Sequence, residues 1–164
     1  MITVGIITAS DKGAAGERED RSGALIAELA AGMGWEVRAA DIVPDDLDAL
    51  KARMIHYADT LAVNIIFTTG GTGFSPRDVT PEATLAVTER LVPGIPEAMR
   101  LESLKVTPRA MLSRAAAGIR GRTLIINLPG SPKAARECLK AILPSLAHGV
   151  EILTGGAGEC GSES

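Results

Sequence analysis

Aromatic residues and an excess of positive charge are both scarce in this sequence. Only Trp35, Tyr57, Phe67 and Phe74 are aromatic among 164 residues. Proteins that bind single-stranded nucleic acids stack successive bases on such side chains. The 17 lysines and arginines are outnumbered by 20 acidic residues, which gives a net charge of -3. Because the field of the whole molecule does not favour polyanions, we expect no nucleic acid partner.

Cysteines and long apolar runs are scarce as well. Cys138 and Cys160 lie far apart, and two such thiols make neither a disulfide framework nor a metal cluster. No apolar run approaches the length of a membrane-spanning helix. Met1 leads directly into a strand pattern, without a basic segment and a cleavage site. We therefore expect a cytoplasmic protein with no membrane partner.

The apolar residues that are present predict strands alternating with helices. Short β-branched and apolar runs predict strands over 2–9, 36–43, 62–68 and 123–128, and we expect a further short strand within 113–119. Apolar residues at three- and four-residue spacing, together with capping residues and prolines, predict the helices. In the first half of the chain they run from Ser22 to the glycines at 32 and 34 and over 47–61. In the second half they run over about 80–91, after Pro96, after Pro108, and from Ser131 to Leu153 with an interruption at Pro144.

This alternation predicts one three-layer α/β/α domain over 1–154, with a mostly parallel sheet and helices on both faces, followed by a flexible tail over 155–164. Sheets of this kind bind ligands beyond the carboxyl ends of their strands. The turns at those ends are 10–20, 44–46, 70–78 and 129–131, and all four carry polar residues or glycine. We expect them to meet at one edge of the sheet.

The turn after the third strand contains Gly70, Gly71 and Gly73, followed by Asp78 and the helix start Thr80-Pro81. Glycines allow backbone N–H groups to approach an anion, and a helix N-terminus adds partial positive charge. The pattern is typical of a phosphate site, although the glycines alone fit a tight turn equally well. Asp78 and Asp45 could also be helix-capping acids, and Asp78 could pair with Arg77.

The best-known nucleotide and hydrolase motifs are missing. The sequence lacks the lysine-containing phosphate loop, the third glycine of the dinucleotide fingerprint and the serine elbow of α/β-hydrolases. These absences disfavour a GTPase, a dehydrogenase and a covalent hydrolase.

Residues 69–84, TGGTGFSPRDVTPEAT, closely resemble the signature of the molybdopterin adenylyltransferases, the MogA-type enzymes and the G domain of gephyrin. The resemblance continues, in the family's order, through Ser10-Asp11, Asp20 to Gly23, Val43 to Asp46, Ala115 to Gly121 and Leu128 to Pro132. It covers nearly the whole chain up to Gly155.

The resemblance implies a Mg²⁺-dependent transfer of AMP from ATP to the terminal phosphate of molybdopterin, which releases pyrophosphate and prepares molybdopterin for molybdenum insertion. Asp45 and Asp78 match the family's two catalytic acids, and we assign both to Mg²⁺. The residues that match the family's substrate-binding positions are Ser10, Asp11, Gly70, Gly71, Thr72, Gly73, Pro129, Gly130 and Ser131. The family also implies a homotrimer, with a molybdenum insertase as a further partner.

Two other functions fit the same fold. One is a module that binds molybdopterin or a partner chain without turnover, as the scaffold role of gephyrin's G domain suggests. The other is a nucleotide pyrophosphatase of the related competence-protein type. Both acids and the intact run Arg77 to Pro81 favour the adenylyltransferase over these alternatives.

Overall fold

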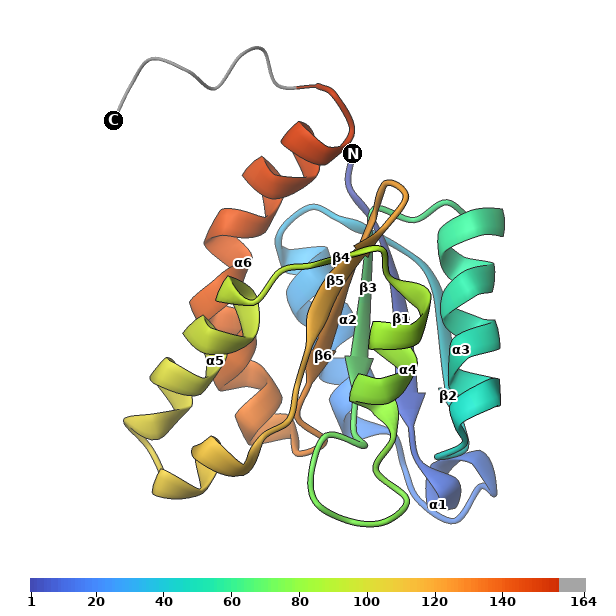
Figure 1. Ribbon diagram of the computed structural model, residues 1–164, viewed down its shortest axis with the longest axis vertical. Coiled ribbons are helices and arrows are strands. Elements are labelled where there is room, and N and C mark those ends of the chain that lie inside the picture. Colours follow the sequence, from blue (N-terminus) through green and yellow to red (C-terminus); the bar gives the residue numbers. More distant parts are fainter. Residues whose placement is uncertain (157–164) are drawn as a thin grey trace.

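Six strands form one mixed sheet in the computed structural model, which describes residues 1–156 (Figure 1). The strand order across the sheet is β2-β1-β3-β6-β5-β4. The parallel strands are β1 (Thr3–Ala9), β2 (Glu36–Val43), β3 (Ile65–Thr69) and β6 (Thr123–Leu128). At one edge, β5 (Ala117–Arg120) runs antiparallel to β6 and β4 (Arg90–Leu91) antiparallel to β5.

Helices cover both faces of the sheet, which confirms the predicted three-layer class. One face packs against α2 (Arg21–Gly32), α5 (Gly94–Leu104) and α6 (Pro132–Leu153). The other face packs against α3 (Leu47–Ile55), the π-helical turn η1 (His56–Thr60) and α4 (Thr80–Val87). Two short elements, α1 (Asp11–Ala14) and the 3₁₀ helix η2 (Pro108–Leu112), lie in the connections.

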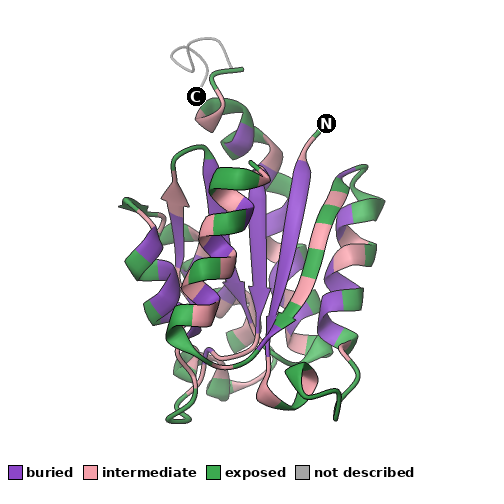
Figure 2. Ribbon diagram, turned by 90° about the vertical axis from the view of Figure 1, so that its right-hand side faces the viewer, coloured by how far each residue is buried: buried purple, intermediate pink, exposed green. Residues whose placement is uncertain are grey.

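The central strands are buried on both faces because each face has its own apolar core. In β1, Val4 and Ile6 belong to the core beside α2 and α6, while Ile7 and Ala9 belong to the core beside α3 and α4. Continuous apolar strands of this kind are typical of a covered parallel sheet. Figure 2 shows the buried central strands, and it shows exposed residues alternating along the edge strand β2.

Two predicted element boundaries differ from those of the structure. The helix predicted to reach about residue 91 ends at Val87, since Thr88 is extended and the next residues pair with β5 through Glu89 N–H and Ile119 O at 2.8 Å. The strand predicted from residue 62 begins at Ile65. Ala62 has a left-handed φ of 50°, so the chain turns there before it enters the sheet.

Several helix details also differ from the prediction. Pro144 does not interrupt α6, whose apolar face stays packed on both sides of the proline. Asp20, not Ser22, caps α2, because its carboxylate accepts the N–H of Gly23 at 2.8 Å. The segment expected after Pro108 forms a 3₁₀ turn, and the helix expected after Pro96 begins at Gly94. The helix predicted over 47–61 changes to π geometry after Ile55.

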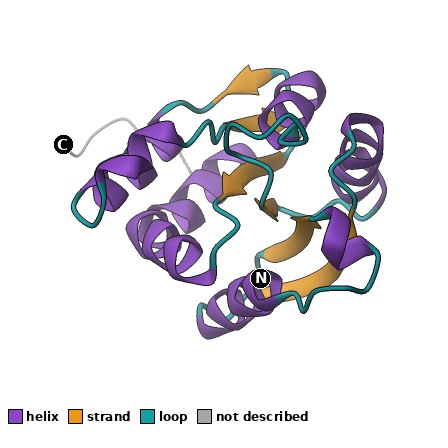
Figure 3. Cartoon of the chain, turned by 90° about the horizontal axis from the view of Figure 1, so that it is seen from below, coloured by secondary structure: helices purple, strands orange, loops and turns teal. Residues whose placement is uncertain are grey.

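The carboxyl ends of the four parallel strands all lie at the same end of the sheet. Figure 1 shows the arrowheads of β1 and β3 pointing to this end, and Figure 3 views the molecule from below, from the same end. From β1 the chain continues to β2 on one side and then crosses to β3 on the other side of β1. The strand order therefore reverses between β1 and β3, and this is the topological switch point where such sheets bind ligands.

No helix within residues 1–156 is both long and apolar enough to cross a membrane. Most of the tail predicted over 155–164, including Cys160, lies outside the described residues.

Candidate functional site

A cleft of about 690 Å³ lies at the switch point and is lined by all four turns that leave the parallel strands. Seven of the predicted site residues line it: Ser10, Asp45, Gly70, Gly71, Asp78, Gly130 and Ser131. These residues come from four separate parts of the sequence. The parallel topology brings them together, as the sequence analysis expected.

The floor of the cleft is built from glycines whose positions exclude a side chain. Gly70 has a φ of +89°, and a Cβ there would lie 2.5 Å from the carbonyl oxygen of Ala9. Gly71 has a φ of +69°, and a Cβ there would lie 2.3 Å from Thr80 Oγ1. Both conformations favour glycine. Gly70 N–H donates to Leu128 O at 3.2 Å, so Gly70 contributes close approach of the backbone and not a donor for a ligand.

Asp45 is held in the cleft by a reciprocal pair of hydrogen bonds with Asp11. The Asp11 N–H donates to Asp45 Oδ2, and the Asp45 N–H donates to Asp11 Oδ1, each at 3.0 Å. Partial burial raises the pKa of the Asp45 carboxyl, and the negative charges of Asp11 and Asp78 raise it further, against the hydrogen bond from Asp11. The positive charge of Arg77 offsets this rise in the pKa only in part.

Asp78 is fixed by the turn that carries it. Its Oδ2 accepts the N–H of Ser75 at 3.0 Å, and its own N–H donates to Ser75 O at 2.9 Å. A Cβ on Gly73 would lie 3.0 Å from Asp78 Oδ2, and one on Gly71 would lie 3.3 Å from Asp45 Oδ1. Both carboxylates thus lie against the same glycine run.

Asp11 does not line the cleft but links three of its turns. Arg77 donates to both carboxylate oxygens of Asp11, at 3.0 and 2.9 Å. This bond is the main reason that the pKa of Asp11 is lowered, with the hydrogen bond from Asp45 second. Arg77 therefore pairs with Asp11 and not with its neighbour Asp78. Through Asp11, the turns at 10–20, 44–46 and 70–78 become one unit.

Three more of the predicted binding residues shape the turns without lining the cleft. The carbonyls of Thr72 and Gly73 accept hydrogen bonds from the backbone and side chain of Arg114, and Pro129 O accepts from Thr69 Oγ1 at 2.7 Å. The sequence analysis missed Arg114, which carries no local motif. Its side chain donates to Gly73 O and to Asp78 O, which lie 41 and 36 positions away in the sequence, so only the fold reveals it.

Thr80 was predicted only as a helix start, and the structure places its hydroxyl against Gly71, outside the lining of the cleft. Thr80 is fully buried, and its Oγ1 has no hydrogen-bond partner within residues 1–156. This oxygen lies beside Gly71, next to the Asp45 carboxylate. A buried polar group without a partner costs about 1–3 kcal/mol, and here it lies directly against the glycine run.

The donor set fits Mg²⁺ in the form that this ion takes with phosphates. Within residues 1–156, no group of three or more histidine, cysteine or acidic side chains could hold a metal. Mg²⁺, however, takes one or two carboxylates and completes its shell with waters and substrate phosphates. Two carboxylates that line one cleft and lie against the same glycine run match that arrangement.

Comparison with known proteins points to one family. Residues 5–148 match the model of the probable molybdopterin binding domain. The chain is 42% identical over 156 residues to a molybdopterin adenylyltransferase of Helicobacter pylori strain J99, which covers 94% of this chain and 89% of the relative. It is 35% identical over 158 residues to the molybdopterin adenylyltransferase of Escherichia coli K12, covering 91% and 80% of the two chains.

A solved structure gives the same result. The molybdopterin biosynthesis enzyme MoaB from Thermus thermophilus superimposes with a TM-score of 0.90 and 52% sequence identity, covering 94% of this chain and 98% of that one. The fold and the sequence agree, and this chain belongs to the family of the probable molybdopterin binding domain.

Proposed function

We propose that this protein is a molybdopterin adenylyltransferase of molybdenum cofactor biosynthesis. It transfers AMP from ATP to the terminal phosphate of molybdopterin, releases pyrophosphate and prepares molybdopterin for molybdenum. One observation carries the proposal: Asp45 and Asp78 lie against a glycine floor in a single cleft. Relatives with 35–42% identity over most of the chain are named for this activity.

In the proposed reaction, an oxygen of the terminal phosphate of molybdopterin attacks the α-phosphorus of ATP. The new P–O bond forms as the bond from the α-phosphorus to the bridging oxygen of pyrophosphate breaks. Both reactants are anions, so the site must offset their repulsion and hold them in line. Asp45 and Asp78 would hold Mg²⁺, directly or through water. When bound, this ion neutralises negative charge on the phosphates.

The remaining residues of the cleft bind and orient the substrates. Ser131 caps the N-terminus of the 22-residue helix α6, where the aligned peptide dipoles favour an anion. Gly130 and Gly70 bring two turns into contact, since a Cβ on Gly130 would lie 3.3 Å from the Cα of Gly70. The absence of side chains there lets phosphates approach the backbone.

The proposal includes a homotrimer, a cytoplasmic location and delivery of the product to a molybdenum insertase. Exposed apolar side chains on α5 and η2 support an oligomer, with Leu101 67% and Met111 65% exposed. The buried thiol of Cys138 is free, which suits a reducing compartment. The product is an activated ligand without its metal, so a protein that inserts the metal must follow.

The activity is tested by supplying molybdopterin, ATP and Mg²⁺ and measuring pyrophosphate release. We expect release by the native chain and a loss of about 10²-fold or more in Asp78→Asn, since several kcal/mol of charge stabilisation depend on the metal. Asp48→Asn is the matched control, because Asp48 is an exposed acid in the first turn of α3 outside the cleft. Molybdopterin binding without pyrophosphate release by the native chain would identify a binding module instead.

A further inference from the structure

We propose that Arg114 is a positioning residue that holds Asp78 in place in the cleft by bridging the two ends of the turn 73–78 from outside the cleft. The inference rests on the proposed function, because it assigns Arg114 a part in that reaction. Arg114 does not line the cleft, so it would act through Asp78 and not on the substrates.

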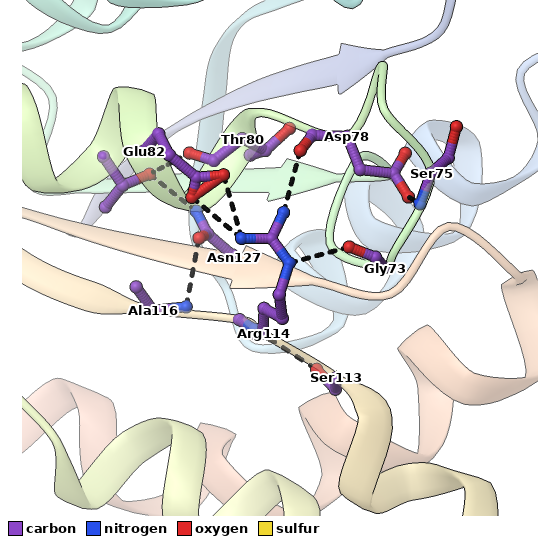
Figure 4. A network of polar contacts seen from close by, with 11 residues as sticks. Gly73, Ser75, Asp78, Thr80, Glu82, Ser113, Arg114, Ala116 and Asn127 are labelled. Carbon is purple, nitrogen blue, oxygen red and sulfur yellow. Dashed lines mark hydrogen bonds and ion pairs between the residues drawn. The ribbon is translucent and has the colours of Figure 1, made fainter.

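The side chain of Arg114 binds both ends of the turn that carries Asp78. Its Nε donates to Gly73 O at 2.7 Å, and its Nη2 donates to Asp78 O at 2.8 Å. Figure 4 shows the guanidinium between these two carbonyls. Since the group is planar and rigid, two bonds from it fix the separation of the two ends of the turn.

The same guanidinium also binds the helix that follows the turn. Its Nη1 lies 2.9 Å from both carboxylate oxygens of Glu82, in the first turn of α4. The backbone N–H of Arg114 donates to Thr72 O at 2.9 Å, on the other side of the turn. One residue therefore connects the start of the turn, its end and the helix behind it.

The segment that carries Arg114 is itself anchored to the sheet and to α5. Arg100 of α5 donates to the carbonyls of Ser113 and Ala115, each at 3.2 Å. On β6, Asn127 Oδ1 accepts the N–H of Ala116 at 3.1 Å, and Asn127 Nδ2 donates to Thr84 of α4 at 2.8 Å. Arg114 therefore joins this anchored segment to a turn that is exposed from Phe74 to Arg77.

The energetics favour a positioning role over a stabilising one. The side chains of Arg114 and Glu82 are 35% and 45% exposed, and ion pairs this accessible contribute little to stability. The two carbonyl bonds, in contrast, are directional. Lysine keeps the charge but offers a single ammonium, which cannot meet Gly73 O, Asp78 O and Glu82 with the geometry of the guanidinium. Misplacing a catalytic group by about 1 Å can cost about 10²-fold in rate.

The test compares Arg114→Lys with Arg120→Lys. Arg120 is a matched control because it also pairs with an acid, Asp59, at 3.0 and 2.7 Å, and donates to a backbone carbonyl, Val87 O, at 2.9 Å. It is the last residue of β5 and pairs with Thr123, the first residue of β6, because the two strands are antiparallel. Arg120 therefore lies at the end of the sheet opposite the cleft. Its side chain is 25% exposed.

Two quantities are measured for each variant. The first is kcat for pyrophosphate release as a function of Mg²⁺ concentration. We expect a fall of about 10- to 100-fold in Arg114→Lys, with more Mg²⁺ needed for half-maximal rate, and a change below about twofold in Arg120→Lys. The second is amide hydrogen exchange of the protein without substrates. We expect faster exchange at residues 73–78 in Arg114→Lys alone.

The outcomes separate this inference from the proposed function. A native chain that releases no pyrophosphate overturns the proposed function, and with it the catalytic part assigned to Arg114. If the native chain is active, equal kcat values in the two lysine variants overturn the inference. So does a fall in Tm in Arg114→Lys while kcat and the exchange of residues 73–78 stay at native values, because that result describes a structural residue only.

Discussion

Asp45 shows a conflict between stability and function within one residue. Its carboxylate is partly buried and lies near Asp11 and Asp78, which raises its pKa. The reciprocal bonds with Asp11 hold it there nonetheless. A site that must attract a cation gains from such a group, while in the folded chain without the cation its ionised form is disfavoured.

We predict that Asp45→Asn stabilises the protein without substrates near neutral pH. Asparagine keeps an oxygen that can accept the Asp11 N–H but removes the charge. Because the side chain is partly accessible and screened by solvent, we expect a gain below about 1 kcal/mol, and thus a rise in Tm of no more than about 2–4 °C. Thermal unfolding with and without Mg²⁺ and ATP measures it, and these ligands should raise Tm in the native chain more than in the variant.

The pH dependence of this gain has a definite sign. The pKa of Asp45 is higher in the folded state than in the unfolded state, so ionisation costs stability as pH rises through the unfolded and then the folded pKa. The advantage of Asp45→Asn is therefore full above both pKa values and vanishes in acid below them. A lower Tm than the native chain at neutral pH would contradict this account, and Asp48→Asn controls for the loss of an exposed acid.

At the scale of elements, the order of strands and helices follows from residue spacing, whereas their ends depend on contacts distant in sequence. The predicted strand over 123–128 matches β6 because every residue in it is buried. The segment from Thr88 to Leu91 looks like a continuing helix, but its last two residues pair with Ile119 and Gly118 of β5 and form the strand β4. Spacing alone cannot reveal that partner.

The same distinction holds for the site. Asp45 and Asp78 could be predicted to meet because parallel strands end at one edge. The carbonyls of Thr72 and Gly73, however, point to Arg114, a partner about forty residues away in the sequence. Short motifs therefore identify the turn, and the fold decides which of its atoms face the ligand.

We predict that Gly70→Ala disrupts the junction of β3 and its turn. The φ of +89° strains any side chain, and the new Cβ would lie 2.5 Å from Ala9 O, so we expect a loss of about 2 kcal/mol or more in the free energy of unfolding. Gly32→Ala is the matched control. A Cβ there meets nothing within 4 Å, and alanine in α2 should stabilise by about 0.4–1 kcal/mol.

Urea unfolding of both variants measures the difference. Similar unfolding free energies for Gly70→Ala and Gly32→Ala would show that the turn adjusts to a side chain, and the close approach of Gly70 to β1 would then not be required. Pyrophosphate release by any folded Gly70→Ala tests whether the floor of the cleft tolerates the added carbon.

At the scale of the whole molecule, large apolar side chains stay exposed on one side. Leu101 and Leu104 lie three positions apart on α5, and Met111 and Leu112 lie on η2, which contacts α5. Val106, in the connection between them, is also exposed. Burial of apolar area contributes about 25 cal/mol per Å², so covering these residues with a further copy of the chain would favour association.

We predict that the protein is a homotrimer in solution and that Leu101→Glu weakens the assembly. Light scattering after size exclusion should give three times the 17.0 kDa chain mass for the native protein and a smaller mass for the variant. Leu85→Glu is the matched control, because Leu85 is also exposed but lies on α4, on the other face of the sheet. A monomeric native protein, or equal dissociation in both variants, would show that α5 and η2 do not form the interface.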